Sequence, residues 1–205
     1  MMGKRIAVIG DGGWGTALAL VLHGNGHDVT VWGPFENVIE KIAATRENET
    51  YLPGIPLPAE IAWTTDRGQA ARECDVAVLA VPTRYFRPVL DSFAGLFPPD
   101  CRFVTVAKGL DQASHERMSV VAQSILGSEQ VAALSGPSHA EEVARGIPTA
   151  VVMAYEDHIL SEELQQVFAA SLFRVYSSDD VVGVELGGAL KNVIAIAVGM
   201  SDGLG

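Results

Sequence analysis

The stretch Ile6–Leu20, which reads IAVIGDGGWGTALAL, decides the fold of this chain. Its first four residues form a short apolar run typical of a buried strand, and its last five begin a helical pattern. Between them, Gly10, Gly12 and Gly15 give the spacing G-x-G-x-x-G. In a strand–turn–helix context these glycines allow a tight turn, close approach of a pyrophosphate, and close packing of helix on strand. The stretch therefore predicts a dinucleotide-binding βα unit.

The glycine turn has two alternative interpretations. A phosphate-binding P-loop requires Gly-Lys-Ser/Thr after the turn, and Gly15 is followed by Thr16-Ala17 instead. The second alternative is a glycine-rich turn with no ligand. The strand before it and the helix N-terminus after it, with free N–H groups and the positive end of the helix dipole, favour a bound phosphate.

Short runs rich in Val and Ile recur along the chain and alternate with helical patterns. Such runs do not alternate with polar residues, which is typical of strands buried on both faces in a parallel sheet. The pattern predicts an α/β fold with a Rossmann-like, doubly wound, mostly parallel sheet. The further strands are expected at Val29–Trp32, Val76–Val81, Phe103–Ala107, Val131–Leu134 and Thr149–Ala154. The helices are expected at Thr16–Gly24, Asn37–Ala44, Arg67–Glu73, Arg84–Leu96, His115–Leu126 and Ser138–Arg145.

Two segments depart from this alternation. Asn48–Pro58 contains three prolines and is expected to be an irregular loop. Ser177–Asp180 resembles a helix start with acidic residues at the positive end of the dipole. The twenty residues that follow are apolar nearly all round, so we expect a helix buried against another element. We divide the chain into a dinucleotide-binding domain, residues 1–180, and the first helix of a helical C-terminal domain, residues 181–205.

The composition excludes several classes of protein. With 14 basic and 25 acidic residues the formal net charge of the 205-residue chain is −11, which disfavours binding to nucleic acid or to anionic membranes. Cys74 and Cys101 are expected to be inert packing residues, and no Cys/His cluster indicates a metal. Val181–Met200 is about as long as a membrane span, but Glu185 and Lys191 lie inside it. Since each charge costs about 2.5–3.5 kcal/mol at a bilayer centre, we expect a cytoplasmic protein without a membrane span.

The choice of dinucleotide rests on the end of the second strand. An NAD-specific site usually has Asp or Glu there to bind the ribose 2′-hydroxyl, and Val31–Phe35 contains neither. No Arg is present for a 2′-phosphate, and Glu36 is the nearest acid. The sequence leaves NAD and NADP open, with a slight preference for NADPH on the missing acid.

Two lysines are candidates for chemistry. Lys108 follows a buried strand at the carboxyl edge of the sheet, where α/β proteins bind ligands, although a surface lysine is the alternative. Lys191 lies in a nearly uniform apolar helix, so a buried ammonium with a lowered pKa is expected. Such a group transfers protons near neutral pH. A snorkelling or ion-paired lysine is the alternative for Lys191.

The segment after the fifth strand combines a cap with a possible anion site. Ser138 and Glu141 have the spacing of a capping box, which predicts a helix starting at Ser138. The same turn offers open N–H groups at the carboxyl end of a strand. His139 alone indicates nothing specific.

Together these stretches are similar to one family. The chain resembles the N-terminal part of the bacterial-type NAD(P)-dependent glycerol-3-phosphate dehydrogenases along nearly all of its length. The matching stretches are Gly10–Leu18 (GDGGWGTAL), Tyr51–Pro53, Val78–Pro82, Val106–Leu110 (VAKGL), Ser135–Ser138, Pro148–Thr149 and Val184–Ala197 (VELGGALKNVIAIA). The last of these is the most specific, since the glycine turn alone indicates only the Rossmann superfamily.

The resemblance implies a role for each matching residue. It implies that Lys191 is the general acid/base. Cofactor contacts are implied for Gly10, Gly12, Gly13, Trp14, Gly15, Pro34, Lys108 and Ala140. Substrate contacts are implied for Lys108, Gly136, Ser138 and Lys191. The family often has a basic or polar residue where Pro34 stands. Because of this departure, the resemblance does not imply how a 2′-phosphate would be recognised.

The implied reaction is reduction of dihydroxyacetone phosphate to sn-glycerol 3-phosphate with NADH or NADPH, by an enzyme that forms a homodimer when full length. Ketopantoate reductase and 6-phosphogluconate dehydrogenase are alternative Rossmann reductases, and the VELGGALKN segment argues against both. A cofactor-binding module without turnover is a further alternative. In the family a C-terminal helical domain supplies an Asp and an Arg-Asn pair, which are not found here. We therefore expect a truncated chain that binds NAD(P)H and turns over poorly.

Overall fold

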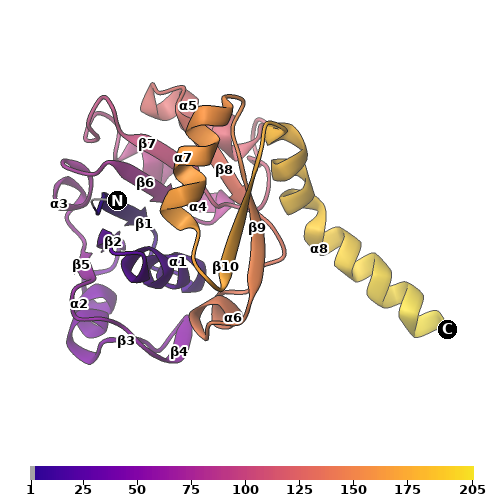
Figure 1. Cartoon of the computed structure of the whole chain (residues 1–205), viewed down its shortest axis with the longest axis horizontal. Helices are drawn as coiled ribbons and strands as arrows, with labels where there is room; N and C mark the ends of the chain where they lie inside the picture. Colours follow the sequence, from indigo (N-terminus) through magenta and orange to yellow (C-terminus); the bar gives the residue numbers. More distant parts are fainter. Residues whose placement is uncertain (1–2) are drawn as a thin grey trace.

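The computed structural model describes residues 3–205 and is built on one eight-stranded sheet (Figure 1). The strand order is β10-β9-β8-β7-β6-β1-β2-β5, and every neighbouring pair is parallel except β8 and β9. The predicted doubly wound, mostly parallel sheet is confirmed. The strands of the sheet are β1 (Arg5–Ile9), β2 (Asp28–Trp32), β5 (Ala62–Thr64), β6 (Val76–Leu79), β7 (Arg102–Thr105), β8 (Val131–Ser135), β9 (Thr149–Ala154) and β10 (Phe173–Ser178).

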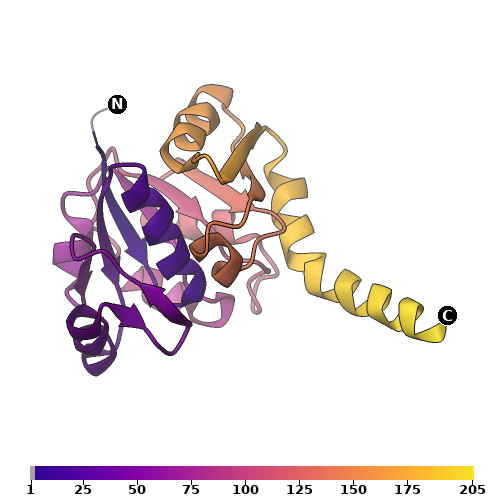
Figure 2. The same cartoon turned by 60° about the horizontal axis from the view of Figure 1, so that its bottom comes forward.

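Helices cover both faces of the sheet (Figure 2). One face packs against α1, α6 and α7, and the other packs against α3, α4 and α5. The helices are α1 (Gly13–Gly24), α2 (Glu36–Thr45), α3 (Arg67–Ala71), α4 (Thr83–Asp91), α5 (Met118–Leu126), α6 (Ala140–Ala144), α7 (His158–Phe168) and α8 (Val181–Leu204).

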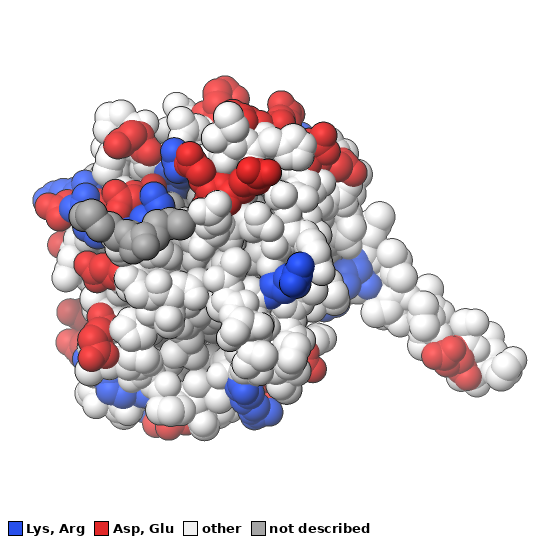
Figure 3. All heavy atoms as spheres, viewed as in Figure 1, with Lys and Arg blue, Asp and Glu red and all other residues white. Residues whose placement is uncertain are grey.

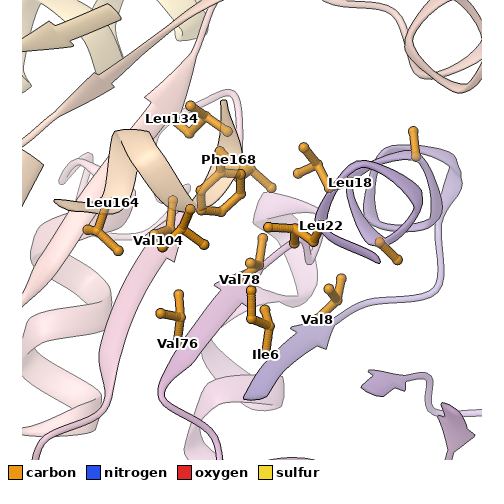
Figure 4. Packing of buried hydrophobic residues seen from close by; sticks show 14 of the residues in the cluster. Ile6, Val8, Leu18, Leu22, Val76, Val78, Val104, Leu134, Leu164 and Phe168 are labelled. Atoms are coloured by element: carbon orange, nitrogen blue, oxygen red, sulfur yellow. The ribbon is translucent and has the colours of Figure 1, made fainter. Parts of the chain in front are cut away.

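Strand β1 shows why the strands are apolar throughout. Ile6 and Val8 point to the face under α1, whereas Ala7 and Ile9 point to the face under α3 and α4. All four are fully buried or nearly so, as expected for a parallel strand covered on both sides. The hydrophobic core on the face covered by α1, α6 and α7 is formed by side chains from α1, α7 and the central strands (Figure 4). The side chains labelled there are Ile6, Val8, Leu18, Leu22, Val76, Val78, Val104, Leu134, Leu164 and Phe168.

The segment expected to be an irregular loop forms a small hairpin, so that expectation is wrong. Strand β3 (Glu47–Asn48) pairs with β4 (Leu52–Pro56) in antiparallel fashion. The hairpin is stable because Leu52 is fully buried and the Glu47 carboxylate accepts a hydrogen bond from Gly54 N at 2.6 Å. The prolines are tolerated because a two-stranded ribbon has edges on which no backbone donor is required.

Several element boundaries also differ from the sequence-based expectation. Strands β5 and β10 and helix α7 were not predicted. Helix α5 begins at Met118 instead of His115, because His115 has a left-handed backbone (φ 60°) that a helix does not tolerate. Ser177–Asp180 leads into a helix as predicted, and the Asp180 side chain caps α8 by accepting a hydrogen bond from Gly183 N at 2.7 Å.

Helix α8 leaves the body of the molecule after its first turns (Figure 1). Only Val181 and Glu185 are buried among its residues, so the prediction of a helix buried along its length is wrong for the described chain. Its first turns pack mainly against β8 and β9, and the later turns project away from the sheet (Figure 1). Leu190, Val193 and Ile196 are 51%, 64% and 64% exposed. Figure 3 shows the projecting part as a largely uncharged rod.

The length and composition of α8 also satisfy the criteria for a membrane span, with a mean hydropathy of 1.7 over its most apolar window. Core helices of soluble proteins satisfy the same criteria, so length and composition do not distinguish a membrane span from a helix packed inside a protein.

Candidate functional site

The candidate site lies at the carboxyl edge of the sheet. Strand β1 ends at Ile9 and leads into the glycine turn, β7 ends at Thr105 shortly before Lys108, and β8 ends at Ser135 before Gly136. These three strands run in the same direction, so their ends meet along one edge of the sheet. This is the edge at which open α/β sheets bind ligands.

The glycine turn depends on two residues that admit no side chain. Gly10 has a φ of 124°, and a Cβ built on it would lie 2.6 Å from the carbonyl oxygen of Ala80. A Cβ on Gly15 would lie 2.2 Å from the carbonyl oxygen of Gly10. Both contacts are with backbone, which cannot move aside as a side chain can. The close packing of helix α1 on strand β1 therefore requires glycine at these positions.

The N-terminus of α1 is open to a ligand. Its N-cap is Gly12, which offers no side-chain acceptor, and the first turn contains no acidic residue. A Cβ on Gly12 would meet nothing within 4 Å, so space in front of the turn is clear. The backbone N–H groups of this 12-residue helix and its dipole thus suit the pyrophosphate of a dinucleotide. NAD and NADP share this group, and the residues present fit both.

Asn48 holds the glycine turn in place, and the sequence analysis did not identify it. Its side-chain nitrogen donates to the carbonyl oxygen of Asp11 at 2.8 Å and to Thr16 Oγ1 at 2.9 Å. Asn48 is only 1% exposed. The hairpin also brings the Tyr51 carbonyl close to Gly13, where a Cβ would lie 2.7 Å from it. No pattern in the sequence indicates this role, because the burial of Asn48 follows from the fold of the hairpin.

Ala140, for which the resemblance implies a cofactor contact, lies beside the glycine turn. Its Cβ would be 3.6 Å from a Cβ built on Gly13, and helices α1 and α6 pack against each other. Pro34 is exposed just after the end of β2, next to the buried Gly33.

Lys108 connects the glycine turn with the loop after β8. Its ammonium donates to Gly136 O at 3.0 Å and to Ser138 Oγ at 3.3 Å, and it lies 5.8 Å from the centroid of the Trp14 ring. Desolvation by burial lowers the pKa of Lys108, and the positive charge of Lys191 lowers it further. Lys108, Gly136, Ser138 and Trp14 are therefore brought together.

The capping box predicted at Ser138 is not formed. Helix α6 begins at Ala140, its N-cap is His139, and no side chain caps it. The Ser138 hydroxyl is instead 3.3 Å from the Lys108 ammonium and donates to Gly136 O at 3.4 Å. A lysine thirty residues earlier in the chain competes for the hydroxyl, and spacing within the segment cannot reveal it.

Lys191 faces a cavity of about 480 Å³ between α8 and the loop after β8. The cavity is lined by Ser135, Gly136 and Pro137 on one side and by Gly187, Gly188 and Lys191 on the other. Lys191 is half-buried, so the expectation of a buried ammonium is met only in part in the described chain. A Cβ on Gly188 would lie 2.6 Å from Ser135 Oγ. Glycine at this position allows α8 to approach the loop.

A buried carboxylate fixes the first turns of α8. Glu185 is 5% exposed and pairs with Arg117 Nη1 at 2.8 Å. It also accepts hydrogen bonds from the backbone N of Ser119 at 2.9 Å and from Ser119 Oγ at 2.5 Å. These contacts join α8 to the N-terminal turn of α5 and thereby set the position of Lys191 relative to Lys108.

The remaining candidates carry no site. Cys74 and Cys101 are buried, with their sulfur atoms 3.5 Å apart, and they flank the amino ends of β6 and β7, opposite the site. Within residues 3–205 no group of three or more His, Cys, Asp or Glu side chains could hold a metal ion.

A doubly wound sheet with an uncapped helix N-terminus after its first glycine turn defines a Rossmann-type dinucleotide-binding protein. A family model described as "NAD-dependent glycerol-3-phosphate dehydrogenase N-terminus" matches residues 5–161, and the corresponding C-terminal model matches residues 180–205. The chain therefore belongs to the NAD-dependent glycerol-3-phosphate dehydrogenase family.

Known relatives agree with this assignment. A glycerol-3-phosphate dehydrogenase (NAD(P)+) of Fusobacterium nucleatum is 46% identical over 202 residues, which are 98% of this chain and 60% of the relative. The crystal structure of glycerol-3-phosphate dehydrogenase from Coxiella burnetii superimposes with a TM-score of 0.89 at 37% identity, over 98% of this chain and 62% of that one. The Plasmodium falciparum enzyme gives a TM-score of 0.91 at 26% identity, over 99% and 60%. The chain thus spans about 60% of the length of the curated relatives it matches.

Proposed function

We propose that the protein is an NAD(P)H-dependent dehydrogenase that reduces dihydroxyacetone phosphate to sn-glycerol 3-phosphate and catalyses the reverse reaction. The observation that carries the proposal is that two lysines converge on the loop after β8. Lys108 lies 5.8 Å from the Trp14 ring and donates to Gly136 O at 3.0 Å, and Lys191 lines the cavity that Gly136 also lines. Membership of the family supports the reaction type and the substrate.

The glycine turn accounts for cofactor binding in this proposal. The N–H groups at the start of α1 bind the pyrophosphate, Ala140 and Trp14 line the approach, and Pro34 lies toward the adenosine end. When bound, the dinucleotide supplies the hydride that is added to the C2 carbonyl carbon of the substrate. Every other part of the reaction falls to side chains and backbone of the chain.

Lys191 supplies the proton in this mechanism. As hydride adds to carbon, the C=O π bond breaks and negative charge develops on the oxygen. The Lys191 ammonium donates a proton to that oxygen, which completes the hydroxyl group and leaves a neutral amine. In the oxidation direction the neutral amine accepts the same proton. Stabilising charge that appears only in the transition state is what accelerates the step.

Lys108 and the loop after β8 hold the substrate. The chain has a net charge of −11, so an anionic substrate must be attracted by local cations against an unfavourable overall field. Lys108 is fixed by Gly136 and Ser138 and adds a second positive charge beside the carbonyl. The open backbone at Gly136 and the hydroxyl of Ser138 add polar contacts.

We also propose the remaining properties that the resemblance implies. Residues 1–180 form the dinucleotide-binding domain and residues 181–205 begin a helical domain, which is supported by family matches ending at 161 and starting at 180. In a cytoplasmic homodimer α8 would pack within that domain. The charged Glu185 and Lys191 support this arrangement over a membrane span.

A substrate screen with the full-length protein tests the proposal. Oxidation of NADH and NADPH is followed with dihydroxyacetone phosphate and with ketopantoate, and reduction of NAD+ and NADP+ is followed with glycerol 3-phosphate and with 6-phosphogluconate. We expect turnover with dihydroxyacetone phosphate and glycerol 3-phosphate only. Turnover confined to another substrate would contradict the reaction, and dinucleotide binding without any turnover would favour a cofactor-binding module.

A further inference from the structure

The end of strand β2 lacks the acid that commonly recognises the adenosine ribose. The strand ends at Trp32 and is followed by Gly33, Pro34 and Phe35, none of which can accept a hydrogen bond through a carboxylate. In dinucleotide-binding sheets this is where an Asp or Glu binds the ribose 2′-hydroxyl. Taken alone, the strand gives no reason for the protein to prefer NAD.

A carboxylate reaches this place from the glycine turn. A Cβ built on Gly33 would lie 2.6 Å from Cγ and 2.8 Å from Oδ2 of Asp11. The Asp11 carboxylate therefore occupies the space that a side chain at position 33 would need. An acid at position 33 and Asp11 in its present conformation would exclude each other, and the turn places a carboxylate at this point instead.

The Asp11 carboxylate is available to a ligand. Apart from its own backbone N–H, no group within residues 3–205 forms an ion pair or hydrogen bond with it. The residue is half-buried, and this desolvation raises its pKa. Its main chain is fixed, because Asn48 donates to the Asp11 carbonyl at 2.8 Å. A fixed, partly desolvated acceptor without a protein donor favours a hydroxyl group from outside.

The segment that follows β2 offers no cation to a 2′-phosphate. Residues 32–40 read WGPFENVIE and contain no Lys or Arg. The nearest charged side chain in that segment is the exposed acid Glu36. A 2′-phosphate, which carries close to two negative charges at neutral pH, would lie beside an uncompensated carboxylate.

We propose that Asp11 selects the cofactor: its carboxylate accepts a hydrogen bond from the ribose 2′-hydroxyl and repels a 2′-phosphate, so the protein prefers NAD(H) to NADP(H). The inference rests on the proposed function and gives it a specificity-determining residue. It replaces the slight preference for NADPH that the end of β2 alone suggests.

Binding titrations of NADH and NADPH, followed by nicotinamide fluorescence, test the proposal on the wild-type protein and on Asp11→Ala and Asp11→Asn. The wild type should bind NADH about tenfold more tightly or better, the size expected for one hydrogen bond to a charged group. Asp11→Ala should bring the ratio of the two dissociation constants to about one, and Asp11→Asn should give an intermediate ratio. Asp28→Asn, the same charge change at the opposite edge of the sheet, should leave the ratio unchanged.

Salt separates the two components of the preference. Raising the ionic strength should narrow the wild-type ratio, because it screens the repulsion of a 2′-phosphate, and should not narrow that of Asp11→Ala. A wild-type preference for NADPH, or a ratio that Asp11→Ala does not change, would overturn the inference while dinucleotide binding remains intact. Loss of binding for both dinucleotides in the wild type would instead overturn the proposed function together with it.

Discussion

The two ends of the candidate site are built in different ways. The glycine-turn end consists of contiguous residues, Gly10–Thr16, and its geometry is a property of the backbone of one βα unit. The lysine end is assembled from three separate segments, which carry Lys108, Ser138 and Lys191. Its geometry depends on side chains and on how α8 docks against the sheet.

This difference determines how each end can fail. A change in the glycine turn alters the packing of α1 on β1 and therefore disturbs the central sheet with the site. A change at the lysine end leaves the sheet intact and alters only charge and position. Stability and cofactor affinity should change together at the first end and separately at the second. The predictions below test this separation, from the largest expected effect to the smallest.

Gly15→Val should have the largest effect. Its Cβ would lie 2.2 Å from the Gly10 carbonyl oxygen, so α1 must move away from the sheet. We expect a loss of about 3 kcal/mol of unfolding free energy, at the upper end of overpacking effects, and no measurable dinucleotide binding. Urea denaturation and NADH titration check this result. Gly24→Ala, in open space at the end of the same helix, should leave both properties nearly unchanged.

Glu185→Gln should separate the two ends. It removes the charge that pairs with Arg117 and leaves that guanidinium without its buried partner. We expect a loss of about 2 kcal/mol of unfolding free energy, discounted because Arg117 is partly exposed. NADH affinity should stay within about twofold of wild type, since the glycine turn is untouched. Glu141→Gln, in an exposed helical pair with Arg145, should cost at most about 0.5 kcal/mol.

If Glu185→Gln abolished NADH binding, the two ends would not be independent. The separation would then be wrong, even if the loss of stability were as expected.

The smallest effect concerns the pH dependence of Lys108. Burial and the charge of Lys191 lower its pKa in the folded state, so between that pKa and the ordinary value of about 10.4 the unfolded chain binds more protons. Stability contributed by this group therefore rises with pH across that window. Lys108→Met lacks this contribution. The thermal midpoint of the wild type minus that of the variant should therefore increase as the pH is raised from neutral toward about 10.4. A difference independent of pH would contradict the lowered pKa of Lys108.

The sequence predicted the glycine-turn end well because its information is local. A strand, three glycines at fixed spacing and a helix specify one another within fifteen residues. The same holds for the alternating apolar strands, whose burial on both faces is confirmed from Ile6 to Ile9. The order of strands follows from short right-handed connections once the elements are known.

At the lysine end, local patterns indicated Lys108 and Lys191 separately, and only the family resemblance placed them in one site. Local spacing predicted that the Ser138 hydroxyl caps a helix, whereas in the structure it accepts a hydrogen bond from Lys108, which lies far away in the sequence. Apolar composition predicted a buried α8, but burial depends on what packs against it, and the described chain supplies partners only for its first turns. The proximity of Asp11 and Gly33 was missed for the same reason, since it follows from the register of β1 and β2.

The most direct test of the central claim is single-turnover oxidation of NADH by dihydroxyacetone phosphate in the full-length protein, comparing wild type with Lys191→Ala. Lys41→Ala, which removes an exposed lysine paired with Glu49, serves as the matched control. The account predicts that Lys191→Ala slows the chemical step about 100-fold or more, the contribution typical of a positioned general acid, while the dissociation constant for NADH stays within about twofold. A rate near that of wild type would contradict the assignment of Lys191 as the proton donor.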